Sequence, residues 1–343
     1  MDLIDLRSDT VTKPTSEMLA AMAAAEVGDD VFGEDPTVKK LEETAARIMG
    51  KEACLLVTSG TMGNLVAVLT HTKKGEEVLL ESESHIYYYE VGGLSALAGA
   101  MPRLVQGQRG RITPQGLADA VRPGNIHFPS PSLLCLENTH NRGGGTVSTP
   151  SEMHEVIALA RQLGLRIHLD GARIFNAALA AGVRVSALAE GCDSVMFCLS
   201  KGLGAPVGSL LAGSREFINS ARKWRKMVGG GMRQSGVIAA AGLVALETMT
   251  ERLAEDHANA KFLAAGLANI PKLTLDADLV QTNIVVVELG QELGGADDFL
   301  TRLKAEGVLA TNFGPHSVRF VTHKDVNRQG VDYALQVIAR MVR

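Results

Sequence analysis

Up to about residue 250, short apolar runs alternate with longer segments in which apolar residues recur at helical spacing. The runs have the length of buried strands and predict strands over residues 53–57, 78–80, 133–136, 166–169, 195–199 and 207–212. Continuous apolar strands separated by helices are typical of a parallel sheet that is covered on both faces. We therefore expect an α/β fold, a three-layer sandwich with a mostly parallel central sheet.

Several of the predicted helices have readable starts. Thr149 is a candidate N-cap, Pro150 occupies the first helical position, and Glu152 stands at the third, where its side chain can complete a capping box. Residues 35–36 and 113–114 repeat the arrangement of a capping residue followed by proline. These signals predict helices that begin at each of the three prolines.

The pattern changes near residue 250. Residues 236–255 are rich in alanine and predict one long helix. After it the chain reads as a strand over 284–287, a helix, a strand over 318–321 and a closing helix near 325–341. We expect a large domain of residues 1–250 and a small C-terminal α/β domain of residues 251–343.

Composition and charge exclude several classes of protein. Of the 343 residues 46% are hydrophobic, which is enough for a large core and excludes a disordered chain. The formal net charge of −4 provides no field for a phosphodiester backbone, so we expect no nucleic-acid partner. The longest apolar run, residues 236–246, is shorter than the roughly 18 residues that a membrane-spanning helix needs. We expect no membrane association.

The amino terminus has acidic residues where a secretory signal would have a basic patch and an apolar stretch, which favours a cytoplasmic protein. The four cysteines lack the C-x-x-C spacing of zinc sites and mostly lie in apolar runs. We therefore expect buried free thiols, and no metal site.

Three motifs follow predicted strands and could carry chemistry. Residues 58–64 are small residues at a strand-to-helix turn, where the backbone N–H groups of Gly60 and Thr61 suit a phosphate group. Asp170 ends the strand at 166–169, and Lys201 directly follows the strand at 195–199. Carboxyl ends of parallel strands are where α/β proteins bind ligands.

Each motif taken alone also fits a purely structural role. The turn at 58–64 could be an ordinary capped turn, Asp170 could pair internally with Arg173, and Lys201 could extend from the sheet edge into solvent. Together they match the needs of pyridoxal phosphate: a phosphate cup, an acid for the ring nitrogen and a lysine for the aldehyde. His85 is a candidate for stacking on the ring, although a capped or solvent-facing histidine is the alternative.

The sequence also resembles a known family, the low-specificity L-threonine aldolases, which are pyridoxal-phosphate enzymes of the aspartate-aminotransferase fold type. The resemblance extends from residue 2 to the closing helix and is weaker between about 256 and 315. The matching blocks are residues 5–12, 28–36, 59–62, 137–141, 168–176, 198–204, 229–234 and 318–323.

The resemblance implies a role for each matching residue. Lys201 would be the Schiff-base lysine, Asp170 would lie at the ring nitrogen, and His85 would stack on the ring. Gly60 and Thr61 would bind the phosphate, and His127 would lie near the substrate hydroxyl. The substrate carboxylate would be bound by Ser8, Arg173 and Arg319, of which Arg173 would also lie beside the cofactor. Two residues would act across a subunit interface, Lys226 on the substrate side and Arg233 toward the phosphate. It further implies that the large domain of residues 1–250 binds the cofactor and that its first residues reach the active site. It also implies a homotetramer with active sites at the dimer interface.

The expected reaction is cleavage of L-threonine or L-allo-threonine to glycine and acetaldehyde. His85, His127 and a histidine-held water remain alternatives for the base that takes the hydroxyl proton. A β-eliminating lyase or racemase would share the lysine, the acid and the phosphate cup. A nicotinamide dehydrogenase would explain the α/β pattern, but residues 202–208 miss the G-x-G-x-x-G spacing by one residue and carry Pro206 where a helix must begin. A non-catalytic scaffold should have lost Lys201 or Asp170, and this chain retains both.

Overall fold

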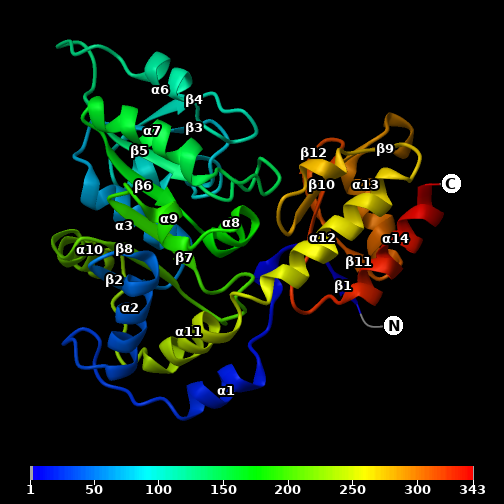
Figure 1. Cartoon of the computed structure of the whole chain (residues 1–343), viewed down its shortest axis with the longest axis horizontal. Helices are drawn as coiled ribbons and strands as arrows, with labels where there is room; N and C mark the ends of the chain where they lie inside the picture. Colours follow the sequence, from blue (N-terminus) through cyan, green and yellow to red (C-terminus); the bar gives the residue numbers. More distant parts are fainter. Residues whose placement is uncertain (1–2, 343) are drawn as a thin grey trace.

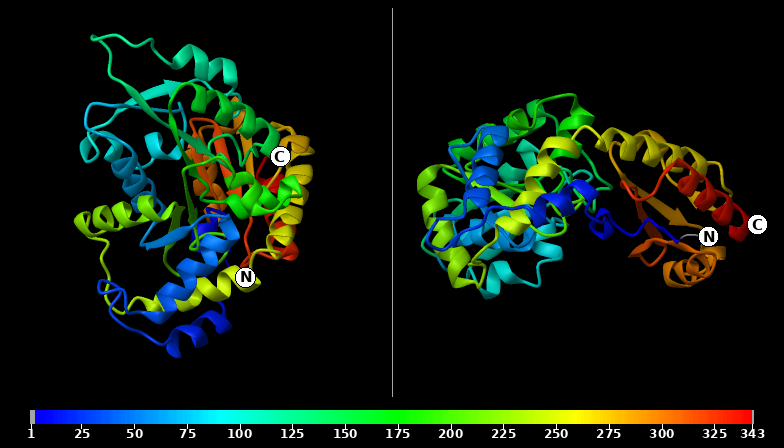
Figure 2. Two further views of the ribbon diagram at one scale, coloured as in Figure 1. Left: turned by 60° about the vertical axis from the view of Figure 1, so that its left-hand side comes forward. Right: turned by 90° about the horizontal axis from the view of Figure 1, so that it is seen from below.

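In the computed structural model, which describes residues 3–342, a large three-layer body is joined to a smaller body through helix α12 (Figures 1 and 2). The central sheet of the large body has seven described strands in the order β2-β8-β7-β6-β5-β3-β4. All neighbouring strands are parallel except β8, which is antiparallel to β2 and β7. Their bounds are β2 Ala53–Val57, β3 Glu77–Glu81, β4 Met101–Val105, β5 Pro131–Glu137, β6 Arg166–Asp170, β7 Ser194–Cys198 and β8 Ser209–Gly213.

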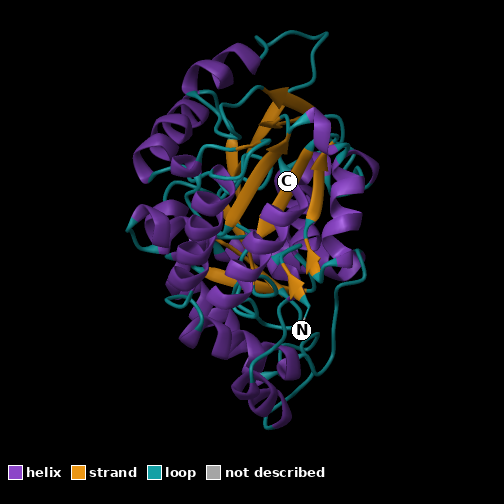
Figure 3. Ribbon diagram, turned by 90° about the vertical axis from the view of Figure 1, so that its right-hand side faces the viewer, coloured by secondary structure: helices purple, strands orange, loops and turns teal. Residues whose placement is uncertain are grey.

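Helices cover both faces of this sheet (Figure 3). Side chains alternate between the two faces along each strand, so that Leu56 of β2 packs into one core while Leu55 and Val57 pack into the other. The helices of the large body are α1 Ser16–Ala23, α2 Pro36–Met49, α3 Gly60–His71, α4 His85–Tyr88, α5 Gly93–Ala96, α6 Pro114–Ala120, α7 Pro150–Gln162, α8 Ile174–Ala181, α9 Val185–Ala189, α10 Arg215–Met227 and α11 Gly236–Thr248, with the 3-10 helix η1 Asp9–Val11.

The smaller body has a four-stranded antiparallel sheet in the order β12-β13-β10-β9, with α12, α13 and α14 packed around its own core. Strand β1 of the amino terminus pairs with β11 of this body, so the first described residues cross from one body to the other. The bounds are β1 Ile4–Asp5, α12 Leu253–Ala268, β9 Leu273–Thr274, η2 Ala277–Leu279, β10 Ile284–Leu289, η3 Gln291–Leu293, α13 Ala296–Ala305, β11 Val308–Leu309, β12 Thr311–Gly314, β13 Ser317–Val321 and α14 Arg328–Val342.

The predicted fold class is confirmed, and so are the three helix starts. Thr149 and Glu152 form a full capping box on α7, and the side chains of Asp35 and Thr113 cap α2 and α6. The domain division at residue 250 stays a prediction, and its end residues 1, 2 and 343 lie outside the described residues. Within 3–342, no helix is long and apolar enough to cross a membrane.

Two predictions about elements were wrong. The single long helix over 236–255 is two helices, α11 and α12, separated by a turn over residues 249–252. The turn lets α12 leave the large body and pack on α14 and β10 of the smaller one. The edge strand β4 was missed, because its side chains are half-exposed and it contains Pro102, which is tolerated at a sheet edge.

Candidate active site

Five of the predicted site residues line one pocket, and Asp170 lies close to one of them, His85. Asp170 is the last residue of β6, and Lys201 follows β7, its neighbour in the sheet. The pocket lies between the two bodies and takes residues from both ends of the chain. It is lined by Ser8, Thr10, His85, Tyr89, Asn141, Arg173, Lys201, Thr311, Asn312, Phe313 and Arg319.

Asp170 is buried and held by hydrogen bonds to both carboxylate oxygens. Its Oδ2 accepts from Nδ2 of Asn64 at 2.8 Å, and its Oδ1 accepts from the backbone N–H of Ala172 at 3.0 Å. Arg173 is not its partner, because the guanidinium of Arg173 binds Asp9 instead. The structural alternative of an Asp170–Arg173 pair is therefore wrong.

His85 stands beside Asp170 at the start of α4. Its Nδ1 lies 2.9 Å from a carboxylate oxygen of the buried Glu90. A ring nitrogen of His85 and one carboxylate oxygen each of Glu90 and Asp170 lie within 4.8 Å of one another. Burial lowers the pKa of His85, but the hydrogen bond to Glu90 and the charge of Asp170 outweigh it and raise the pKa above its ordinary value. The imidazole is thus tied by one nitrogen to an acid.

Two arginines from opposite bodies face the pocket. Arg173 donates from Nε and Nη2 to Asp9, and Arg319 donates from Nη1 to Oδ1 of Asn141 at 2.7 Å. The Nε of Arg319 is buried and has no hydrogen-bond partner among the described residues. Burial and the nearby charge of Arg173 lower the pKa of Arg319 to about 10. An anion placed between the two guanidinium groups would offset both the cost of burying the charge of Arg319 and its repulsion by Arg173.

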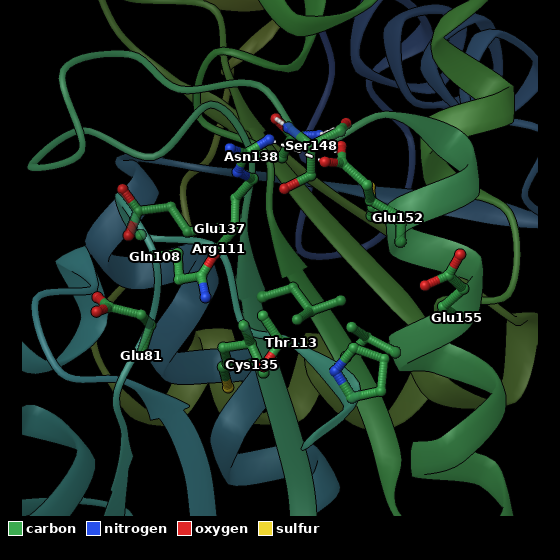
Figure 4. A pocket seen from close by; sticks show the side chains of 16 residues that line it. Glu81, Gln108, Arg111, Thr113, Cys135, Glu137, Asn138, Ser148, Glu152 and Glu155 are labelled. Carbon is green, nitrogen blue, oxygen red and sulfur yellow. Dashed lines mark hydrogen bonds and ion pairs between the residues drawn. The ribbon is translucent and has the colours of Figure 1, made fainter. Parts of the chain in front are cut away.

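Glu137, at the end of β5, connects the two sides of the pocket. Its Oε2 accepts from the backbone N–H of His85 at 2.6 Å, and its Oε1 accepts from that of Asn141 at 2.8 Å. Its carboxylate also borders a second pocket, across which Arg111 and Glu152 form an ion pair at 2.8 Å (Figure 4). Glu137 therefore fixes the loops that carry His85 and the partner of Arg319.

The turn at 58–64 ends in the first turn of α3. Ser59 caps the helix by accepting from the N–H of Met62 at 3.1 Å, which leaves the N–H groups of Gly60 and Thr61 directed out of the helix end. A Cβ atom at Gly60 would stand 3.0 Å from Sγ of Cys198 on β7. Glycine therefore allows the helix terminus to approach the sheet.

Three predicted site residues lie away from this pocket in the single chain. His127 is exposed on the loop between α6 and β5. Lys226 is exposed near the end of α10, and the exposed Arg233 pairs with Asp29 at 3.0 Å. None of the three is among the residues that line the pocket with Lys201. Gly60, Thr61 and Asp170 do not line it either, although a carboxylate oxygen of Asp170 lies within 4.8 Å of a ring nitrogen of His85.

The sequence analysis missed the residues that hold the predicted ones in place. A buried arginine such as Arg173 needs an acidic partner, so its place after a strand was a signal that an acid such as Asp9 would lie beside it. No comparable signal pointed to the others, because their positions depend on tertiary packing. They are Asp9, Asn64, Glu90, Glu137 and Asn141.

Comparison with known proteins agrees with this geometry. Residues 5–289 match the model of the family described as beta-eliminating lyase. The chain belongs to the beta-eliminating lyase family. It is 46% identical to a probable low-specificity L-threonine aldolase 2 of Arabidopsis thaliana, over 98% of this chain and 97% of that one. It is 45% identical to the low specificity L-threonine aldolase of Escherichia coli, over 95% and 96%.

The fold also matches that of solved structures. The threonine aldolase of Leishmania major superposes with a TM-score of 0.84 at 19% identity, covering 99% of this chain and all of that one. The resemblance found in the sequence is thereby confirmed.

The cofactor of the family is pyridoxal 5'-phosphate, as predicted. The residues present fit it. A capped helix terminus with two outward N–H groups lies at Gly60, and Lys201 lines the pocket. Asp170 has no arginine partner within the part of the chain that the structure describes, so its carboxylate is available for the ring nitrogen. The Nε of Arg319, which has no partner within residues 3–342, supplies a donor for an anionic substrate beside it.

Proposed function

We propose that this chain cleaves L-threonine and L-allo-threonine, β-hydroxy-α-amino acids, to glycine and acetaldehyde. The observation that carries the proposal is the convergence of Arg173 and Arg319 on the pocket of Lys201 and His85. A pair of guanidinium groups selects a carboxylate. An amino group one carbon away from that carboxylate would be placed to replace the amine of Lys201 on the aldehyde of the cofactor. The sequence relatives named as threonine aldolases support the same substrate class.

The cofactor would be held at three points. Lys201 would bind its aldehyde carbon, Asp170 its ring nitrogen, and the N–H groups of Gly60 and Thr61 its phosphate, with His85 against the ring. When bound, pyridoxal phosphate supplies an electron sink for the bond broken at the substrate Cα. Asp170 would face the ring nitrogen with a carboxylate whose two oxygens accept from Asn64 and from the backbone N–H of Ala172.

The chain's own residues would choose which bond breaks. Ser8, Arg173 and Arg319 would hold the substrate carboxylate and so fix the rotation about Cα. His85, His127 and a water held by either histidine remain candidates for accepting the hydroxyl proton. Replacing each histidine by asparagine and measuring kcat against pH would decide; full activity in both variants would remove both from this role.

We further propose a homotetramer whose active sites lie at the dimer interface. Large apolar side chains stand exposed on the single chain, including Phe32 at 75%, Val91 at 97% and Ile126 at 96%. Lys226 and Arg233 would then act in the partner's site, and His127 would reach a site through assembly. We also expect a cytoplasmic location, because all four cysteines are free thiols, as is usual in a reducing compartment.

Incubation of the cofactor-loaded protein with L-threonine tests the proposed reaction. Equal amounts of glycine and acetaldehyde are expected, with no product from the Lys201→Ala variant. A ketoacid and ammonia would instead indicate the β-eliminating alternative and would overturn the aldolase assignment. Parallel assays of L-threonine and L-allo-threonine give the preference at Cβ.

A further inference from the structure

A chain of buried polar side chains leads away from Asp170 through the sheet. Asn64 on α3 joins Asp170 to His168 on β6, and the chain continues through Ser194 on β7 to His71 at the end of α3. Asn64, His168 and Ser194 have no exposed surface, and His71 is 5% exposed. Such a chain in an apolar core is costly unless every group is paired, and here each link lies between 2.8 and 3.0 Å.

The direction of every hydrogen bond in this chain is fixed by one residue. Asn64 carries two Nδ2 hydrogens, and both go to carboxylates, one to Asp170 and one to Glu90, each at 2.8 Å. Its Oδ1 therefore faces Nε2 of His168 as an acceptor, at 3.0 Å. His168 must carry its proton on Nε2.

The same reasoning extends to the far end. Nδ1 of His168 is then an acceptor, so the hydroxyl of Ser194 donates to it at 2.8 Å. Ser194 has only one hydrogen, and it must therefore accept from Nε2 of His71, also at 2.8 Å. All donors in the chain point toward the carboxylates of Asp170 and Glu90.

Both histidines are uncharged in this arrangement. Burial lowers the pKa of His168 to about 4, although the charge of Asp170 opposes it, and burial lowers the pKa of His71 to about 3. Because the side-chain amide of Asn64 does not take up and release protons, this series of hydrogen bonds is not a path for proton transfer. It offers Asp170 an oriented set of dipoles without a competing charge.

We propose that Asn64 and His168 are positioning residues that hold the Asp170 carboxylate aimed at the ring nitrogen of the cofactor, with Ser194 and His71 fixing the imidazole of His168. The proposal rests on the proposed function, since it deepens the role given to Asp170. An apolar residue at position 168 would leave Oδ1 of Asn64 unpaired and free the amide to turn. Asp170 would then lose the one side-chain donor that it has among residues 3–342, while every residue lining the pocket stayed in place.

The first test is made on the wild-type protein without cofactor or substrate, so that it is independent of the reaction. Nitrogen-15 NMR of the histidine side chains should show His71 and His168 as neutral Nε2–H tautomers from pH 8 down to pH 5.5. A proton on Nδ1 of His168, or protonation of His168 near pH 6.5, would overturn the proposal.

The second test compares His168→Leu with His168→Gln, which keeps an N–H donor for Asn64. Leucine should weaken binding of pyridoxal phosphate about tenfold and move the pH transition of the bound cofactor's visible absorbance down by about one unit. Glutamine should restore most of both properties. Ser209→Ala is the matched control, because Ser209 is equally buried on β8 and its hydroxyl has no partner among the described residues. It should change neither property.

A folded His168→Leu protein with wild-type cofactor affinity and absorbance would overturn the proposal. If His168→Leu does not fold by circular dichroism, Ser194→Ala serves instead, because it unties both imidazoles without removing them. It should shift the absorbance transition in the same direction by a smaller amount. An unchanged transition in Ser194→Ala would count against the proposal as well.

Discussion

Asp9 and Arg173 form a doubly hydrogen-bonded ion pair, with Nε to Oδ2 and Nη2 to Oδ1 both at 2.7 Å. The aspartate is fully buried, and the arginine's charge, opposing the effect of burial, holds the pKa of Asp9 far below its usual range. Asn283 donates a further hydrogen bond to Asp9 at 3.2 Å. The pair occupies one side of the guanidinium fork and leaves Nη1 for a ligand in the pocket.

The Asp9→Asn substitution should therefore impair substrate binding more than chemistry. An amide cannot accept both N–H groups in the same geometry, and Arg173 would lose its orientation. We expect KM for L-threonine to rise at least tenfold with a smaller change in kcat. Breaking a buried ion pair on one side should also lower the free energy of unfolding by about 3 kcal/mol. Steady-state kinetics and urea unfolding measure the two effects.

Asp5→Asn is the matched control for this prediction. Asp5 pairs with Arg7, whose side chain is half-exposed, so the pair should contribute less than about 1 kcal/mol. The variant should keep its KM. An unchanged KM in Asp9→Asn as well would mean that Arg173 does not take part in binding the carboxylate.

Glu137→Gln tests the connection between the two sides of the pocket. A glutamine side chain has one acceptor oxygen, so it can retain the bond to either His85 or Asn141, but not to both. We expect kcat/KM to fall at least tenfold, because each bond is charge-assisted. Glu155→Gln provides the control: Glu155 lines the same second pocket but is exposed on α7 (Figure 4). Equal activities of the two variants would refute the positioning role of Glu137.

The buried His257 predicts part of the acid sensitivity of the fold. Burial, with the charge of Lys261, lowers its pKa to about 4 in the folded chain, against 6.5 when exposed. The unfolded chain thus takes up a proton at higher pH than the folded chain. The stability contributed by neutral His257 is complete above pH 6.5 and is lost as the pH falls toward 4.

In His257→Gln this contribution is absent. Between pH 6 and pH 4.5, the free energy of unfolding of the wild type should fall more steeply than that of the variant, by up to about 1.4 kcal/mol per pH unit. Urea unfolding at a series of pH values measures both slopes. Parallel slopes would show that His257 does not titrate differently in the two states.

The large sheet could be predicted because its strands are buried on both faces and read as continuous apolar runs, as in β2 and β7. Capping residues placed the helix starts for a similarly local reason. The turn between α11 and α12 could not be predicted, since alanine-rich sequence continues toward it and the turn depends on where the smaller body docks. The edge strand β4 lacks the apolar run altogether.

At the site, the sequence indicated the residues that follow strands, and the structure brings Lys201, His85, Arg173 and Arg319 to one pocket. It could not indicate which polar residues would be their partners. Asn64 lies one turn into α3 and reads as an ordinary polar helix residue, yet it faces two carboxylates. Such pairings are set by contacts between segments 26 and 106 residues apart in the sequence, which periodicity does not encode.

The proposed sharing of active sites between subunits predicts that two inactive variants restore each other. Lys201→Ala removes the amine from a subunit's own pocket, and Arg233→Ala removes the exposed arginine that is proposed to act in the partner's pocket. In a mixed dimer, one site then carries both changes and the other carries neither. Random mixing of differently tagged, co-expressed chains should therefore recover about a quarter of the wild-type activity. If Arg233 acted in its own subunit, each site in a mixed dimer would keep one defect, and the mixture would be no more active than the Arg233→Ala variant alone.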